Sequence, residues 1–376
     1  MKDARRVVIK IGSAVVATDS GLDLEMIGRL AGEVSALRKR GIECILVSSG
    51  AIAAGTGKMG LNQEIRSIPE KQAAAAVGQP GLLQAWEIAF GGNGDKVAQI
   101  LLTRDDLSNR GRYLNARNTL FTLLRWKVIP IINENDTVMV EEIKFGDNDN
   151  LSSMIVSLIE SNAYINLTQI DGLYDRDPRK YADAQLVQVV PKITRKVMDM
   201  ASKEPGAFGR GGMHSKLSAA RKVAMVGVPT VIANGRQKGV LEDIFDGRAP
   251  GTLFLPDDRS IGRRKYWIAF TTKSEGELIV DDGACWALTQ RGKSLLPSGI
   301  RDVRGNFRIG AKVLLVGPDD ATIGVGLVNY PADEIRKIKG CKTDQIQEKL
   351  GYKFYDEVVH RDNLVISEDS SLCRMD

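Results

Sequence analysis

Two clusters of short polar side chains stand where a binding or catalytic site would need them. The run Gly146–Asn150 (GDNDN) precedes a helical pattern that starts at Leu151, so two carboxylates and two amides meet at the expected start of a helix. Such a group could bind a cation, orient an ammonium group or hold a polar ligand. A capped loop is the simpler explanation, but a cap needs only one Asp or Asn. We therefore interpret the run as functional.

The second cluster, Ile132–Thr137 (INENDT), follows an apolar run that is typical of a buried strand. A solvated loop is the alternative interpretation. In a parallel sheet, however, ligands bind beyond the carboxyl ends of the strands, where short loops converge. The two clusters together indicate a ligand site more strongly than either does alone.

A glycine-rich run, Gly209–Lys216 (GRGGMHSK), places a lysine at the head of an expected helix. Its glycines would let main-chain N–H groups surround phosphate oxygens, and Lys216 would add a positive charge. The order of residues is not that of a Walker A loop, and a flexible surface loop is the alternative. Ser48–Ala51 (SSGA) offers a weaker anion site of the same kind. Lys10, near the end of the first expected strand, could neutralise phosphoryl charge beside such a site.

Other residue types exclude several chemistries. The chain has two histidines and four cysteines, none in a CxxC pair, so a Ser-His-Asp triad, a zinc site and a disulfide framework are not indicated. Gly55–Gly60 satisfies GxGxxG but lies several residues after a strand instead of at the strand–helix turn. We interpret this segment as a flexible linker.

Length and composition indicate a globular protein of more than one packed unit. The 376 residues are 43% apolar and 26% charged, with a formal net charge of +5 that is too small to identify a nucleic-acid partner. We see no apolar run long enough for a membrane span and no signal-peptide core, and expect a cytoplasmic location.

Apolar strands alternate with helical patterns over the first 250 residues, which predicts an α/β fold: a three-layer sandwich with a mainly parallel sheet. Strands are expected at 5–11, 42–47, 97–102, 128–132, 163–167 and 230–233, and helices at 23–41, 70–90, 113–126, 151–160 and 215–226. Short strand-like pieces follow at 266–270, 277–280, 312–316 and 324–328. We expect a catalytic domain over 1–257, a linker over 258–274, a small β-barrel domain over 275–353 and a tail over 354–376.

On these residues the chain resembles the glutamate 5-kinases of the amino acid kinase family, in the long form that carries a C-terminal PUA domain. The resemblance covers nearly the whole chain. The matching stretches are Val8–Ser13, Val47–Gly55, Leu101–Arg104, Leu114–Arg117, Ile131–Asp136, Gly146–Leu151, Gly172–Tyr174, Asp177–Arg179, Gly211–Met213, Arg291–Ile300, Gly305–Phe307 and Val359–Asp362.

The resemblance implies an amino acid kinase-like fold and ATP-dependent phosphorylation of the L-glutamate γ-carboxylate, the first step of proline biosynthesis. It implies ATP and Mg²⁺ as cofactors, proline as a feedback inhibitor, and a homo-oligomer, dimeric or tetrameric, without a membrane. By the same resemblance the catalytic residues are Lys10, Lys216 and Asp149, and the glutamate-binding residues are Ser49, Asp136 and Asn148. The nucleotide-contact residues are Lys10, Thr168, Gln169, Arg210, Gly211, Gly212, Met213, His214, Ser215 and Lys216.

Elementary chemistry agrees with these implied roles. A carboxylate with a pKa near 4.3 is already an ionised nucleophile at neutral pH, so a reaction at that group requires no general base. The obstacle is repulsion between two anions, which lysines, Mg²⁺ and main-chain amides would offset. We therefore expect the ammonium groups of Lys10 and Lys216 to meet at one edge of the sheet.

Two positions depart from the family pattern, and two alternatives stay open. Gln169 stands where the family usually has Asp and Arg210 where it has Thr, which leaves purine contacts and nucleotide preference undetermined. One alternative is a related kinase that acts on aspartate, acetylglutamate or carbamate. The other is an RNA-binding protein that acts through the PUA-like domain. Residues 258–376 hold 19 Lys and Arg against 18 Asp and Glu, and a net charge of only +1, without an arginine-rich stripe, gives RNA binding little support.

Overall fold

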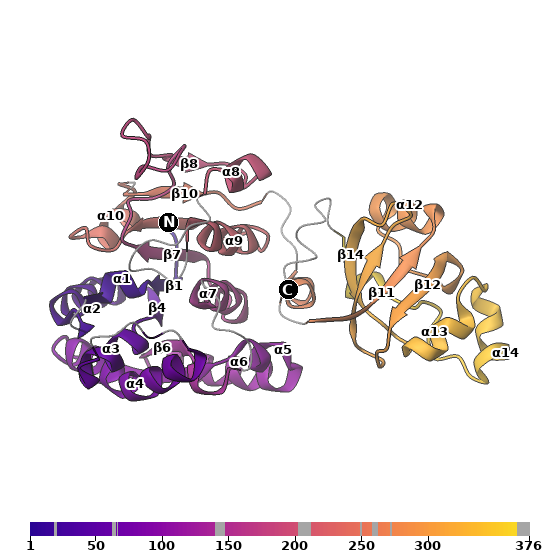
Figure 1. The fold of residues 1–376 in the computed structure, drawn as a ribbon, viewed down its shortest axis with the longest axis horizontal. Helices are drawn as coiled ribbons and strands as arrows, with labels where there is room; N and C mark the ends of the chain where they lie inside the picture. Colours follow the sequence, from indigo (N-terminus) through magenta and orange to yellow (C-terminus); the bar gives the residue numbers. More distant parts are fainter. Residues whose placement is uncertain are drawn as a thin grey trace. The chain divides into compact units, whose positions relative to one another are not determined.

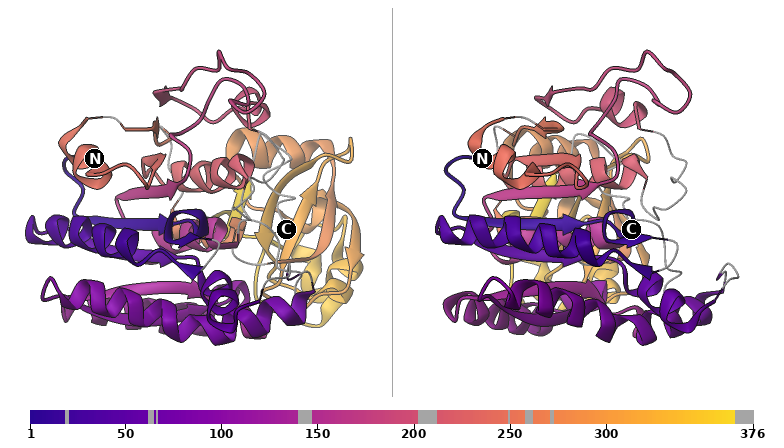
Figure 2. Two further views of the ribbon diagram at one scale, coloured as in Figure 1. Left: turned by 60° about the vertical axis from the view of Figure 1, so that its left-hand side comes forward. Right: turned by 90° about the vertical axis from the view of Figure 1, so that its left-hand side faces the viewer.

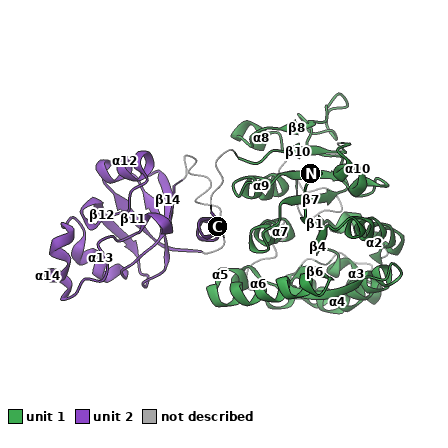
Figure 3. Cartoon of the chain, turned by 180° about the vertical axis from the view of Figure 1, so that it is seen from behind, with its two compact units in different colours: residues 1–261 green, residues 262–376 purple. Residues whose placement is uncertain are grey.

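The chain forms two compact units, residues 1–261 and residues 262–376 (Figure 3). The computed structural model describes residues 1–18, 21–61, 65, 67–139, 147–201, 212–248, 250–257, 262–270 and 273–366. Each unit has its own apolar core, and each is described by itself below.

The first unit is built on an eight-stranded sheet with the order β5-β6-β4-β1-β7-β9-β10-β8. All neighbouring pairs run parallel except β9 and β10, which are antiparallel. The common direction of the central strands can be followed in the two turned views of Figure 2. The strands are β1 (Arg6–Ile11), β4 (Glu43–Ser48), β5 (Lys96–Leu102), β6 (Val128–Glu134), β7 (Ala163–Thr168), β8 (Val189–Val190), β9 (Thr230–Asn234) and β10 (Thr252–Phe254), with a hairpin of β2 (Ala17–Thr18) and β3 (Gly21–Leu22).

Helices cover both faces of this sheet, which confirms the three-layer α/β prediction (Figure 1). One face carries α1 (Ser13–Val16), α2 (Leu24–Lys39), α3 (Ala51–Met59), α4 (Ile68–Gly91) and α10 (Val240–Asp246). The other carries α5 (Arg104–Ser108), α6 (Arg110–Arg125), α7 (Asp147–Leu158), α8 (Arg195–Asp199) and α9 (Met213–Ala224). In the described part of the chain no helix is both long and apolar enough to cross a bilayer.

The alternation of side chains along the central strands decides which residues reach which layer. In β1 and β7 the odd-numbered residues, among them Ile9 and Ile165, enter the main core together with α2, α4 and α10. The even-numbered residues, among them Lys10 and Asn166, therefore point to the opposite face, where α7 lies. A polar residue at an even position thus faces α7 instead of the apolar core.

The predicted flexible linker at Gly55–Gly60 is wrong, because Ala51–Met59 is helix α3. The glycines allow this helix to pack closely on α4. A Cβ atom on Gly55 would lie 1.8 Å from the Ala74 carbonyl oxygen, and one on Gly78 would lie 1.9 Å from that of Ala51. Glycine is therefore required at this crossing by backbone contact, and not for loop flexibility.

The second unit holds a five-stranded sheet with the order β12-β11-β13-β14-β15. Its strands are β11 (Ser274–Val280), β12 (Ile300–Gly305), β13 (Lys312–Val316), β14 (Thr322–Leu327) and β15 (Leu364–Ile366). Its helices are α11 (Arg263–Phe270), α12 (Asp282–Arg291), α13 (Ala332–Ile338) and α14 (Ile346–Leu350). Short 3-10 helices lie at Pro297–Gly299, Thr343–Gln345 and Arg361–Asn363 in this unit and at Asp136–Val138 in the first.

The strand-like segment expected at 266–270 is part of helix α11, so this prediction is wrong. The ring centroids of Tyr266 and Phe270 are 5.0 Å apart, a contact between residues four apart that a helix allows and a strand does not. Aromatic residues favour strands in isolation, but here Tyr266 and Phe270 are buried on a short helix that contacts β14 and β15. Helix α11 also occupies part of the expected linker and β15 lies within the expected tail; residues 367–376 of that tail lie outside the described residues.

Candidate functional site

The start of helix α7 places three polar residues in its first turn. The helix begins at Asp147, so Asn148, Asp149 and Asn150 belong to the helix and not to a loop before it. The first turn of a helix carries unpaired N–H groups and the positive end of the helix dipole, and both favour anions. The helix contacts β1, β4, β6 and β7, and so lies across the centre of the sheet.

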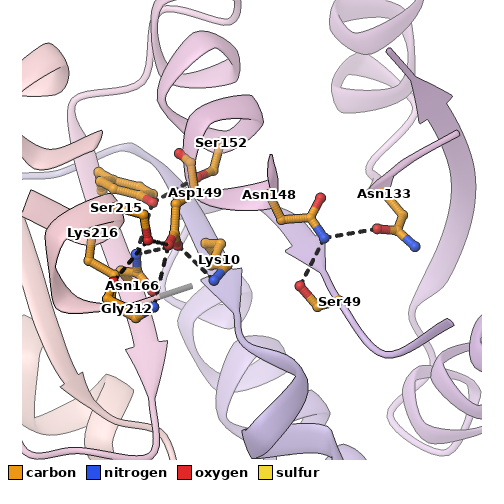
Figure 4. A network of polar contacts seen from close by, with 11 residues as sticks. Lys10, Ser49, Asn133, Asn148, Asp149, Ser152, Asn166, Gly212, Ser215 and Lys216 are labelled. Carbon is orange, nitrogen blue, oxygen red and sulfur yellow. Dashed lines mark hydrogen bonds and ion pairs between the residues drawn. The ribbon is translucent and has the colours of Figure 1, made fainter. Parts of the chain in front are cut away.

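Asp149 is the centre of a buried ionic cluster (Figure 4). Its side chain is fully buried, and its Oδ1 atom lies 2.7 Å from Lys10 Nζ. Its Oδ2 atom lies 3.3 Å from Lys216 Nζ and 2.7 Å from the Ser215 hydroxyl, and the Asn166 amide donates to Oδ1 at 2.9 Å. Both lysines are 5% exposed. The expected meeting of the Lys10 and Lys216 ammonium groups is therefore confirmed: one carboxylate holds both.

Burial and charge act in opposite directions on this cluster. Burial by itself raises the pKa of Asp149, but Lys10 and Lys216, with hydrogen bonds from Lys10 and Ser215, overcome this and hold the pKa well below its usual range. Burial lowers the pKa of Lys216, Lys10 adds to this effect, and Asp149 opposes it. Asp149 is thus a permanent anion that allows two cations to lie close together in a buried place.

The sheet register explains why these side chains meet. Lys10 on β1 stands opposite Asn166 on β7, and both point to the face that α7 covers. Lys216 and Ser215 lie in the first turn of α9, which packs against α7. Two strands, β1 and β7, and one helix, α9, therefore contribute donors to the carboxylate that α7 carries at the carboxyl edge of the sheet.

A second group of polar side chains surrounds Asn148 (Figure 4). The Asn148 amide nitrogen donates to the Ser49 hydroxyl at 2.8 Å and to Asn133 Oδ1 at 3.0 Å. Ser49 directly follows β4, and Gly50, with a φ of 118° that favours glycine, turns the chain into α3. The Asn148 Oδ1 atom is buried and has no hydrogen-bond partner among the described residues. This oxygen can accept a hydrogen bond from a ligand.

The other predicted site residues lie at the same edge or outside the description. Thr168 ends β7 and is buried, and the next residue, Gln169, is exposed. Asp136 starts the 3-10 helix that follows β6. The remaining predicted residues belong to the start of α9: Gly212 is its N-cap, Met213 is half-buried and His214 is exposed, while Arg210 and Gly211 lie outside the described residues.

Three residues of the site were not singled out from the sequence. Asn166 was detectable, because it is the one amide in an otherwise apolar strand pattern. Asn133 lay within the noted cluster after β6, but its contact with Asn148 depends on the tertiary fold. Gln79 on α4, whose Oε1 atom accepts from Asn133 Nδ2 at 2.7 Å, carries no recognisable signal in the sequence.

The described residues contain no group of three or more His, Cys, Asp or Glu side chains that could hold a metal ion. Both oxygens of the Asp149 carboxylate already contact donors. A divalent cation at this carboxylate would have to displace one of these donors and lie beside two ammonium groups, so the cluster does not fit a protein-bound metal.

Comparison with known proteins places these residues in a family. The model of the amino acid kinase family matches residues 5–234, and that of the PUA domain matches residues 276–350. Glutamate 5-kinase of Syntrophus aciditrophicus is 52% identical over 366 residues, which cover 97% of this chain and 95% of that protein. The glutamate 5-kinases of Geobacter sulfurreducens and Geobacter metallireducens are 52% and 53% identical, and each alignment covers 97% of this chain and 98% of the relative. The match includes the strands and helices that carry Lys10, Ser49, Asn148, Asp149 and Lys216, and the chain belongs to the amino acid kinase family.

Proposed function

We propose that the chain is a glutamate 5-kinase, which transfers the γ-phosphoryl group of ATP to the γ-carboxylate of L-glutamate in the first step of proline biosynthesis. The observation that carries this proposal is the pairing of two buried lysines on one ionised carboxylate, next to a cluster of amide and hydroxyl groups around Asn148. The relatives named glutamate 5-kinase support the choice of substrate.

The reaction needs no general base. A γ-carboxylate oxygen of glutamate attacks the γ-phosphorus atom and forms the new P–O bond, while the bond from that phosphorus to the β–γ bridging oxygen breaks. ADP leaves with the electron pair of that bond. The nucleophile is ionised at neutral pH, so the work left to the protein is positioning and charge neutralisation.

The Asp149 cluster neutralises charge, and the Asn148 cluster positions the substrate. The ammonium groups of Lys10 and Lys216 neutralise the phosphoryl oxygens, on which negative charge is spread in the transition state. Asp149 keeps the two lysines at a fixed separation and does not itself accept a proton, since its pKa is held low. Asn148, Ser49 and Asp136 bind the polar groups of glutamate, and Thr168, Gln169 and the start of α9 contact the nucleotide.

Mg²⁺ is expected to accompany ATP, bound to its phosphate oxygens, as is usual for kinases. The described residues offer no separate cage for the ion, so we derive no step from it. Inhibition by proline and assembly into a dimer or tetramer stay predictions from the family resemblance.

The test is ADP formation by the purified full chain with ATP, Mg²⁺ and L-glutamate, with hydroxylamine present to trap the acyl phosphate as a hydroxamate. We expect hydroxamate in step with ADP for L-glutamate, and neither product for L-aspartate, N-acetyl-L-glutamate or carbamate. Turnover with one of these acids in place of L-glutamate refutes the choice of substrate. ADP formation that does not depend on any acid refutes the transfer itself.

A further inference from the structure

A chain of three side-chain amides runs from helix α4 to the start of helix α7. Gln79 Oε1 accepts a hydrogen bond from Asn133 Nδ2 at 2.7 Å, and Asn133 Oδ1 accepts one from Asn148 Nδ2 at 3.0 Å. In each contact the nitrogen of one amide faces the oxygen of the amide before it. The chain of amides therefore has a direction, and it ends at Asn148 Oδ1, which is buried and unpartnered among the described residues.

The direction of this chain decides what Asn148 offers to a ligand. The Asn148 amide nitrogen already donates to Ser49 and Asn133, so both of its N–H groups are used. A rotation of the amide by 180° would bring its oxygen against the Asn133 oxygen and leave its N–H groups in the place of Oδ1. As long as Asn133 keeps its oxygen toward Asn148, the ligand meets an acceptor and not a donor.

Asn133 is held in the required orientation from two sides. Its Oδ1 also accepts from the backbone N–H of Glu134 at 2.9 Å, and its nitrogen faces Gln79. Asn133 is 3% exposed, so its N–H group cannot turn to water if Gln79 is lost. The Gln79 backbone is fixed by the close crossing of α3 and α4 at the neighbouring Gly78.

We propose that Gln79 is a positioning residue for substrate recognition: through Asn133 it keeps Asn148 Oδ1 directed toward the α-ammonium group of the amino acid. This inference rests on the proposed function and extends it to a residue that does not touch the substrate. An ammonium group can only donate hydrogen bonds, so a fixed acceptor selects for it. The chain of amides would thus favour an α-amino dicarboxylate over the same dicarboxylate without its amino group.

The test compares Gln79→Met, which keeps the length of the side chain but lacks the acceptor, with Gln79→Glu, which keeps it. Gln84→Met, at an exposed position on the same helix, is the matched control. For Gln79→Met we expect the KM for L-glutamate to rise about tenfold, the equivalent of one lost hydrogen bond, while the KM for ATP and kcat stay nearly unchanged. Gln79→Glu should restore most of the affinity for L-glutamate.

Glutarate, which lacks the α-ammonium group, separates positioning from a general loss of structure. Its inhibition constant against L-glutamate should be the same for wild type and Gln79→Met, with thermal unfolding measured on both to confirm folding. An equal loss of affinity for glutarate and L-glutamate, or no change for either, overturns the role of Gln79. If wild-type protein forms no ADP with L-glutamate, the proposed function itself is refuted. If wild type is active and Gln79→Met has the same kinetics, only the role of Gln79 is refuted.

Discussion

Replacement of Asp149 by Asn tests the buried ionic cluster most directly. The two side chains have nearly the same shape, so an Asn at this position keeps an oxygen for the donors around it but removes the negative charge. Lys10 and Lys216, each 5% exposed, then lie close together in a buried place without a counter-charge. We expect the free energy of unfolding at pH 7 to fall by about 3–5 kcal/mol, the usual cost of an unpaired buried charge.

The loss has an upper limit that depends on pH. Lys216 can escape the penalty by giving up its proton, which for a lysine of pKa about 10.4 costs about 4.6 kcal/mol at pH 7 but only about 1.9 kcal/mol at pH 9. Burial and Lys10 already lower the pKa of Lys216, and Asp149 alone among the three main causes raises it. In the variant the folded protein therefore binds fewer protons than the unfolded chain between the lowered pKa of Lys216 and about 10.4, so its stability rises with pH over that range.

The assay is urea unfolding of wild type and Asp149→Asn at pH 7, 8 and 9, with Asp199→Asn, an exposed position on α8, as control. We expect the difference in unfolding free energy between wild type and Asp149→Asn to narrow steadily as the pH rises, and kcat at pH 7 to fall at least about a hundredfold. A gap that stays constant from pH 7 to 9 refutes the reasoning, because the lost stability would then not come from a buried ammonium group.

Three further predictions test the other parts of the site. Lys216→Met should lower kcat at least about a hundredfold and leave the KM for L-glutamate within about threefold, since the lysine acts on phosphoryl charge; the reverse pattern in steady-state kinetics contradicts this role. Asn148→Asp removes both donated hydrogen bonds, so the KM for L-glutamate should rise at least about tenfold while that for ATP stays constant. Gly55→Ala or Gly78→Ala should destabilise the protein by more than about 2 kcal/mol through backbone overlap, whereas Gly81→Ala, with nothing within 4 Å of the added Cβ, should not lower the Tm in thermal unfolding.

Strand positions were predictable because buried parallel strands are apolar throughout, and this pattern depends on local sequence alone. The start of α7 was less predictable. Asp and Asn disfavour helix interiors but suit a first turn, so GDNDN was interpreted as a run before the helix although Asp147 begins it. The linker prediction at Gly55 was wrong for a related reason. Glycine is common in linkers, and only the contact with helix α4 shows that Gly55 is needed for packing.

The residues of the candidate site also differ in how far the sequence alone could predict their contacts. Lys10, Asp149 and Lys216 carry charge at the ends of predicted elements, and the α/β pattern is sufficient to bring their elements to one edge. The contact of Asn133 with Gln79 is different, because it depends on how α4 lies relative to β6, a tertiary feature that no local pattern encodes. Asn and Gln side chains also occur in many sequence contexts, so their hydrogen-bond partners can be identified only from the folded structure.

The start of α7 links the two halves of the site through consecutive residues. Asn148 faces Ser49 and Asn133, Asp149 faces the two lysines, and Asn150 accepts a hydrogen bond from Lys222 of α9 at 2.6 Å (Figure 4 shows the first two groups). Consecutive helical side chains diverge by about 100°, so one turn contacts the ends of β4 and β6, strand β1 and helix α9. A helix start held by these contacts cannot shift toward one group without loosening another. Transfer between two anions requires such a fixed separation, because a displacement of about 1 Å can lower the rate about a hundredfold.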